Sequence, residues 1–243
     1  MYGWRGRIGI IIPSSNTTCE PELQAMAPDG VSVHAARVFN PEVKSEAEKE
    51  AAILQMNKEI ERAAREVASV EPAVIVYGCT TGSFLRGPGS DQEVEEKITS
   101  ATGIQALTTT TAVVEAIKVL GLKKIAMATP YTSGTACKER DFLEKVIPGL
   151  TVVMEKNLEI VSNLARGRLF PFTAYQAVRE IVTSEVDGMF ISCTNWRTIE
   201  IIDAVERDLG RPVVTSNQAS LWLGLRKMRM PGNLKYGQIF SHI

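Results

Sequence analysis

The chain has 243 residues, 44% of them hydrophobic, which suffices for one large domain or two small ones with real cores. Its formal net charge of -1 and its scattered Lys and Arg residues argue against nucleic-acid binding. No segment approaches the roughly 18 apolar residues of a membrane span, and no signal-peptide pattern follows the basic start, so we expect a cytoplasmic protein without a membrane partner.

The first part of the chain alternates short apolar segments with longer segments of helical periodicity, which is typical of a parallel α/β sheet. Ser45 suits the start of the first helix, because its hydroxyl can cap free backbone N–H groups. The predicted elements are, in chain order, a strand at 7–12, a helix at 45–70, strands at 73–77 and 104–107, and a helix at 112–120.

The second part of the chain repeats this order. Its predicted elements are a strand at 124–128, helices at 137–146 and 175–184, strands at 188–192 and 212–214, and a helix at 221–226. In each part the first strand runs into a proline and hydroxyl residues. A later strand runs into Cys79-Thr80-Thr81 in the first part and into Cys193-Thr194-Asn195 in the second.

This duplication predicts an α/β fold of two similar halves, each with a central parallel sheet flanked by helices. We expect a pseudo-twofold axis between the halves and an active site at their junction, since parallel sheets bind ligands beyond the carboxyl ends of their strands. The predicted halves are residues 1–121 and 122–243, and the C-terminal segment 221–243 is expected to form a helix that can pack on the first half.

The chain has four widely spaced cysteines and two histidines, and this limits the kinds of catalytic and metal sites that it can form. The absence of a CxxC pair argues against a zinc ribbon, and the shortage of histidine argues against a His-based triad or a multi-His metal site. No glycine-rich nucleotide motif follows the first strand. We therefore expect neither a metal nor an organic cofactor.

Cys79 and Cys193 are the candidate catalytic residues, because they lie just past equivalent strands. Backbone N–H groups and neighbouring hydroxyls can lower a thiol pKa there. The polar residues that follow them are candidate substrate contacts: Thr80, Thr81, Thr194 and Asn195. Cys19 stands beside acidic residues and Cys137 on a predicted helix, so both are interpreted as structural.

A polar run after the first strand predicts a carboxylate cradle. Ser14 and Asn16 are neutral donors near a helix start, where anions bind without Arg or Lys. The competing interpretation is a helix cap at Thr17 or Thr18. Tyr131 and Ser133 hold the equivalent place in the second half.

Four segments together resemble the maleate cis-trans isomerase and arylmalonate decarboxylase family of the aspartate/glutamate racemase superfamily. They are Ile11–Thr18, Tyr77–Thr80, Ala128–Tyr131 and Ser192–Asn195. The resemblance implies a homodimer, a small mono- or dicarboxylate substrate and no cofactor. It also implies that Cys79 is the nucleophile and Cys193 the second cysteine, and that Asn16, Tyr131 and Asn163 hold the substrate carboxylates.

Several functions fit these residues. The first is isomerisation of maleate to fumarate by addition of the Cys79 thiolate to the double bond. A second is racemisation by two thiols on opposite faces of one carbon atom. A third is decarboxylation of a substituted malonate, although the family decarboxylase keeps only the second-half cysteine. A non-catalytic carboxylate-binding protein is the fourth, and it has no need of paired thiols.

Overall fold

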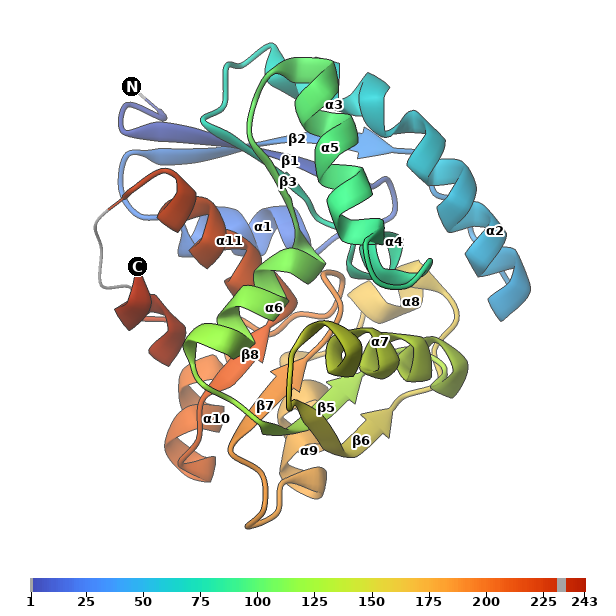
Figure 1. Cartoon of the computed structure of the whole chain (residues 1–243), viewed down its shortest axis with the longest axis vertical. Coiled ribbons are helices and arrows are strands. Elements are labelled where there is room, and N and C mark those ends of the chain that lie inside the picture. The colour runs from blue at the N-terminus through green and yellow to red at the C-terminus, as the bar shows by residue number, and fades with distance from the viewer. Residues whose placement is uncertain (1, 231–234) are drawn as a thin grey trace.

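The computed structural model describes residues 2–230 and 235–243, and it contains two four-stranded parallel sheets (Figure 1). The first sheet has the order β2-β1-β3-β4 and the second the order β6-β5-β7-β8, so the same topology occurs twice. This confirms the predicted α/β fold of two similar halves. The strands are β1 (Gly6–Pro13), β2 (Val31–Val38), β3 (Val74–Tyr77), β4 (Ala106–Thr108), β5 (Lys124–Thr129), β6 (Thr151–Asn157), β7 (Gly188–Ile191) and β8 (Val213–Thr215).

Helices cover both faces of each sheet. Those of the first half are α1 (Cys19–Met26), α2 (Glu46–Met56), α3 (Ile60–Ala68), α4 (Thr80–Phe84), α5 (Ser90–Thr102) and α6 (Thr109–Val119). Those of the second half are α7 (Ser133–Val146), α8 (Asn163–Gly167), α9 (Pro171–Ile181), α10 (Ile202–Leu209) and α11 (Ser216–Lys227).

The buried strands explain why this sequence forms layers. Ile10 and Ile12 of β1 belong to a core shared with α1 and α11, whereas Ile11 belongs to a second core with α3 and α5. Successive side chains of a strand point to opposite faces of its sheet, so an uninterrupted apolar strand such as β1 needs a cover on both.

The expected helix at 45–70 is three consecutive elements: α2, the 3-10 helix η1 (Asn57–Glu59) and α3. The change of helix type lets α2 extend away from the first sheet towards the second half, at the edge of the molecule in Figure 1. Two contacts fix it there, a hydrogen bond from Thr132 to Glu46 and an ion pair between Lys138 and Glu50.

The C-terminal part of the chain packs on the first half. Helix α11 lies against α1, α6 and β3, and the hydroxyls of Ser220 and Thr109 are 2.9 Å apart. The helix expected at 221–243 instead begins at Ser216 and ends at Lys227, a 3-10 helix follows at Gln238–His242, and residues 231–234 of that expectation lie outside the described residues. The division of the chain at residue 121 stays a prediction.

Two features are missing from residues 2–230 and 235–243. No helix there combines the length and the apolar character of a membrane-spanning segment. Nor does that part of the chain bring three or more His, Cys, Asp or Glu side chains together in a way that could hold a metal ion.

Candidate active site

The two predicted cysteines follow equivalent strands, Cys79 after β3 and Cys193 after β7. Both are free thiols, 8% and 5% exposed respectively. Burial raises the pKa of Cys79, and the negative charge of an ionised Cys193 raises it further, because the two thiols lie near each other. The junction of the two halves therefore brings both thiols to one place.

A small cavity of about 40 Å³ lies beside Cys79, with room for a few water molecules. Three of the predicted site residues line it: Cys79, Thr81 and Asn163. Cys193 is not part of the lining, but the hydroxyl of Tyr131 is hydrogen-bonded to the Cys193 thiol and to Thr81, which lines the cavity.

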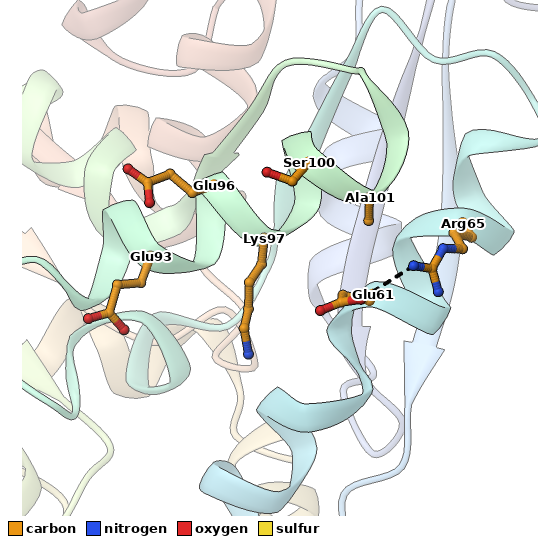
Figure 2. A pocket seen from close by; sticks show the side chains of 7 residues that line it. All are labelled: Glu61, Arg65, Glu93, Glu96, Lys97, Ser100 and Ala101. Atoms are coloured by element: carbon orange, nitrogen blue, oxygen red, sulfur yellow. Dashed lines mark hydrogen bonds and ion pairs between the residues drawn. The ribbon is translucent and has the colours of Figure 1, made fainter.

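A larger hollow of about 460 Å³ occurs elsewhere, between α3 and α5 (Figure 2). It is lined mostly by charged side chains, and Arg65 is paired with Glu61 at 3.3 Å. Neither cysteine lines it. An open surface hollow of this kind lacks the buried, convergent polar groups of a catalytic site.

Cys193 has an unusual backbone conformation, with a φ of +103°. A non-glycine residue is strained there, and such strain persists only where surrounding contacts hold it. The Cys193 N–H donates to Oγ of Ser216 at 3.0 Å, and the N–H of Asn195 donates to its sulfur at 3.4 Å. These contacts fix the direction of the thiol.

Cys79 is held by a hydrogen-bonded chain that the sequence analysis did not find. Burial raises its pKa to about 11, while the N–H of Gly82 and the hydroxyl of Tyr77 act in the opposite direction. Tyr77 also donates to Oδ1 of Asn57 at 2.5 Å, and Asn57 donates to the Gly82 carbonyl at 2.9 Å. Because a phenol has one proton, Tyr77 donates to Asn57 while Cys79 is neutral and must donate to the sulfur instead to stabilise the Cys79 thiolate.

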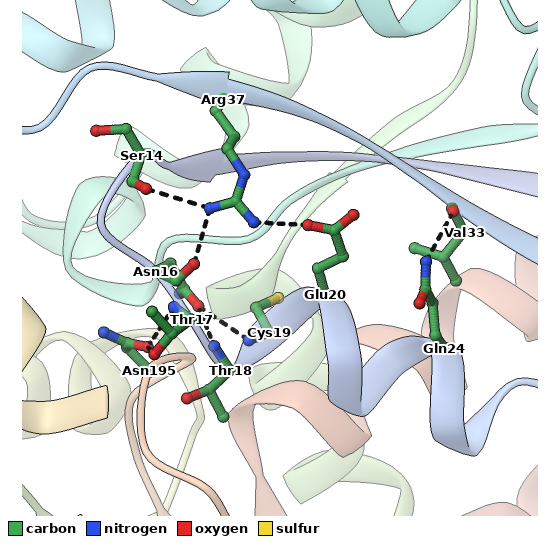
Figure 3. Close-up of polar contacts among 10 residues, drawn as sticks. All are labelled: Ser14, Asn16, Thr17, Thr18, Cys19, Glu20, Gln24, Val33, Arg37 and Asn195. Carbon is green, nitrogen blue, oxygen red and sulfur yellow. Dashed lines mark hydrogen bonds and ion pairs between the residues drawn. The ribbon is translucent and has the colours of Figure 1, made fainter. Parts of the chain in front are cut away.

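Asn16 connects the two halves. Its Oδ1 accepts hydrogen bonds from the N–H groups of Thr18 and Cys19 (Figure 3). Its Nδ2 donates to Oγ1 of Thr194, in the second half, at 3.0 Å. Thr18 stands at the N-cap position of α1, but its side chain makes no capping hydrogen bond, and the Asn16 side chain accepts from the first N–H groups of the helix instead. Arg37 supports the loop by donating to the carbonyls of Ser14 and Asn16.

Asn195 makes a second connection between the halves. Its Oδ1 accepts from the N–H of Thr17 at 2.9 Å, and its Nδ2 donates to the Asn163 carbonyl at 2.7 Å. Asn163 in turn donates to Oγ of Ser15 at 2.8 Å. These bonds position the side chain of Asn163 on the cavity wall.

Three other predicted residues lie further from the cavity. The Ser14 hydroxyl accepts from the N–H of Asn40. Thr80 donates to Oγ of Ser216 at 3.3 Å, so it supports the backbone of Cys193. The structure does not bring Ser133 into the group, since it is exposed at the start of α7 and bonded to Glu159.

The expectation of an entirely neutral cradle is wrong, because two cations line the cavity. Lys49 of α2 is 5% exposed and Arg166 of α8 is 3% exposed. The Lys49 ammonium lies 4.7 Å and the Arg166 guanidinium 4.9 Å from the centroid of the Tyr131 ring. Burial, and next the charge of Arg166, lower the pKa of Lys49 to about 7.

Helical spacing could have revealed Lys49. It precedes Ile53 by four positions and Met56 by seven, and all three line the cavity. A lysine within an apolar stripe of this kind points inward. Arg166 follows a short irregular segment, and its burial depends on its bonds to the carbonyls of Ile160 and Val161, for which the sequence has no signal.

Two duplicated parallel sheets that meet at their carboxyl ends, with the Cys79 thiol on the cavity wall and the Cys193 thiol bonded to Tyr131 nearby, define a two-cysteine α/β enzyme. The chain belongs to the arylmalonate decarboxylase family, which matches residues 8–240.

The relatives of known function in this family include isomerases and a decarboxylase. The chain is 31% identical to a maleate isomerase of Nocardia farcinica over 235 residues, which covers 93% of this chain and 91% of that protein. It is 30% identical to the arylmalonate decarboxylase of Bordetella bronchiseptica over 189 residues, which covers 73% and 75% respectively.

Solved structures are similar over nearly the whole chain. A cysteine-to-serine variant of the Nocardia farcinica maleate cis-trans isomerase, with a covalently bound succinylcysteine intermediate, has a TM-score of 0.90 at 27% identity and covers 98% of this chain and 99% of its own. A doubly substituted arylmalonate decarboxylase in its liganded form has a TM-score of 0.85 at 25% identity and covers 98% and 100%.

Proposed function

We propose that this chain is an isomerase that converts maleate into fumarate by covalent addition of Cys79. The observation that carries the proposal is the pair of buried thiols after β3 and β7. A family decarboxylase needs one thiol, whereas covalent isomerisation uses a nucleophile and a proton donor. The succinylcysteine of the Nocardia farcinica relative is the adduct that such an addition would form.

The reaction begins with the ionised Cys79, because the thiolate is the nucleophile. Its sulfur forms a bond to one alkene carbon of maleate, and the π electrons move to the other carbon and its carboxylate. The C=C bond becomes a single bond. Before the attack, the hydroxyl of Tyr77 and the N–H of Gly82 stabilise the negative charge on the Cys79 sulfur.

Cys193 completes the cycle as a proton donor and acceptor. Its thiol protonates the carbanion and leaves a succinyl thioether on Cys79. After rotation about the new single bond, the Cys193 thiolate removes the proton and the Cys79 thiolate leaves with its bonding electrons, which gives fumarate. Burial raises the pKa of the Cys193 thiol, and the hydrogen bond from the Tyr131 hydroxyl acts in the opposite direction by stabilising the thiolate.

The polar groups around the thiols are proposed to orient the substrate. Asn163 lines the cavity, and Asn16 and Thr194 lie where the two halves meet. Thr81 lines the cavity next to Cys79 and binds the Tyr131 hydroxyl. Assembly into a homodimer stays a prediction.

Decarboxylation of a substituted malonate is the second candidate, favoured by the family and by the retained Cys193. Racemisation stays a third possibility, since two thiols on opposite faces of one carbon suit it.

Proton NMR in D₂O separates these reactions. The protein is incubated with maleate, with phenylmalonate and with aspartate or glutamate in turn. We expect the fumarate signal from maleate, in samples treated with a chelator and in untreated samples alike. The proposed isomerisation would be contradicted if maleate gave no fumarate while phenylmalonate lost carbon dioxide. It would also be contradicted if maleate gave no fumarate while an amino acid took up deuterium at its α-carbon.

A further inference from the structure

The buried cations of the cavity, Lys49 and Arg166, make no ion pair within residues 2–230 and 235–243. Lys49 donates one hydrogen bond, to Oγ1 of Thr135 at 2.9 Å. Arg166 uses Nε and Nη2 on the backbone carbonyls of Ile160 and Val161, at 2.6 to 2.9 Å. Two N–H groups of Lys49 and both of Arg166 Nη1 therefore stay available to a ligand.

The acidic side chains nearby are held by other partners. Glu46 accepts hydrogen bonds from the hydroxyls of Thr132 and Thr135, each at 2.7 Å. Glu139 accepts from Ser192 at 2.6 Å. Neither carboxylate comes within ion-pair distance of Lys49, so the cavity keeps a positive charge that these acids do not neutralise locally.

Placing two like charges in a buried cavity is costly unless an anion compensates them. Both side chains line the cavity that also exposes the Cys79 sulfur, so a small ligand seated there touches the thiol and the cations together. A maleate molecule at Cys79 has a second carboxylate to place, and the cations are the charged donors on the same wall.

We propose that Lys49 and Arg166 form a subsite for the second carboxylate of the substrate and make this pocket selective for dianionic acids over their half-amides. The inference rests on the proposed function, because it assumes a substrate that presents one reacting carbon to Cys79 and a second carboxylate to the cations. Lys49 is the specificity-determining residue, and Arg166 is both ligand and support.

The electrostatics agree with this assignment. The pKa of Lys49 falls to about 7 through burial and the charge of Arg166, while Cys193, Glu46 and Cys79 act in the opposite direction. The other ionisable groups that face it are Glu139, whose ionisation its charge favours, and Tyr131, whose ring lies beside it. A bound carboxylate would favour the charged ammonium and so raise this pKa.

The test is calorimetric titration with succinate and with succinamate, which match in shape but differ by one charge and lack the reactive double bond. At slightly acidic pH the wild-type chain should prefer succinate by roughly tenfold or more, the size expected for a charged hydrogen bond. Lys49→Met should lose most of that preference and still fold, because methionine fits the same space without a buried charge.

Two further variants provide the controls. Lys49→Arg keeps the charge and should keep the preference. In wild type, the affinity for succinate should fall above about pH 7 as Lys49 loses its proton. In Lys49→Arg the affinity for succinate should not change over the same pH range. Lys118→Met removes an exposed lysine paired with Glu115 and should leave the preference unchanged.

The inference is overturned if folded Lys49→Met discriminates between the two ligands as well as wild type does. It is also overturned if wild type binds both equally. Because neither ligand can be isomerised, these outcomes are separate from the NMR assay of the proposed function. A chain that selects succinate through Lys49 but leaves maleate unchanged would contradict the isomerisation alone.

Discussion

Asn16 donates from Nδ2 to Oγ1 of Thr194 at 3.0 Å, although the two residues are 178 positions apart in the chain. This bond joins the loop after β1 to the residue that follows Cys193. The Thr194 hydroxyl in turn donates a hydrogen bond to the carbonyl of Gly78 at 3.1 Å. Gly78 is the residue directly before Cys79. One polar chain therefore sets the relative position of the two thiols.

Asn16→Ala should reduce turnover and also destabilise the fold. The variant leaves the N–H groups of Thr18 and Cys19 without their acceptor in a buried place, which costs about 1–3 kcal/mol for each unsatisfied group. Asn16→Asp is the matched comparison, since it keeps both accepted bonds and removes the donor to Thr194. Urea unfolding and maleate kinetics should show a smaller loss of stability but a clear loss of turnover in Asn16→Asp. Wild-type kinetics in both variants would show that this connection has no role in the site.

Gly82→Ala should abolish most activity, because an added Cβ would lie 2.3 Å from the Tyr77 hydroxyl and 3.1 Å from the Cys79 sulfur. The new methyl group would displace Tyr77 and break its bond to the thiol. Gly224→Ala is the control: its nearest neighbour would be 3.7 Å away, and alanine favours the α11 helix. Steady-state kinetics and thermal unfolding of both variants test the difference, and equal activity would contradict the close packing around Cys79.

Tyr77→Phe should make the Cys79 thiol harder to ionise. The phenol hydrogen bond lowers a pKa that burial has raised to about 11, and phenylalanine removes that bond. Alkylation of Cys79 by iodoacetamide at mildly alkaline pH, mapped by peptide mass spectrometry, should slow by several-fold. Tyr175→Phe, at an exposed tyrosine bonded to Asp208, should leave the rate unchanged. An unaltered or faster reaction in Tyr77→Phe would mean that Tyr77 does not stabilise the thiolate.

Glu139 should make the stability of the fold depend on pH. Burial raises its pKa from 4.5 to about 8, so the folded chain binds this proton more tightly than the unfolded chain does. The stabilisation is complete below pH 4.5 and is lost as the pH rises to about 8, with a slope of up to about 1.4 kcal/mol per pH unit. Glu139→Gln should unfold in urea with a shallower pH dependence over this window. An identical slope in the two proteins would contradict the assignment.

The sequence predicts those parts of the fold in which neighbouring residues are all apolar. Residues 74–77 of the predicted strand at 73–77 are apolar and buried in the structure, and the same holds for residues 188–191 of the predicted strand at 188–192. The edge strands β2 and β6 were not predicted, because β2 mixes Ser32, His34 and Arg37 with apolar residues and β6 carries Glu155 and Lys156. A strand with one neighbour and partial exposure has no clear period in its sequence.

The residues of the candidate site differ in the same way: a local sequence pattern predicts some of them, and only the fold identifies the others. Cys79 and Cys193 were predictable because the duplication marks equivalent strand ends, and the polar run at Asn16 because it follows a strand. Tyr77 was assigned to a buried strand, and only the fold shows that its hydroxyl reaches Cys79 and Asn57. Lys49 and Arg166 line the cavity from segments that carry no catalytic motif, and their burial there depends on how α2 and α8 pack where the two halves meet.

The most direct test of the central claim is intact-mass spectrometry of a Cys193→Ser variant after incubation with maleate. In this variant water supplies the proton that the carbanion takes up, but no thiolate removes it for the return step, so the adduct on Cys79 should accumulate. We expect a mass increase of one maleic acid molecule per chain, mapped to the Cys79 peptide and absent when Cys79 is also replaced by serine. An unmodified protein that still produces fumarate, or an adduct that maps to Cys19 or Cys137 instead, would contradict covalent catalysis by Cys79.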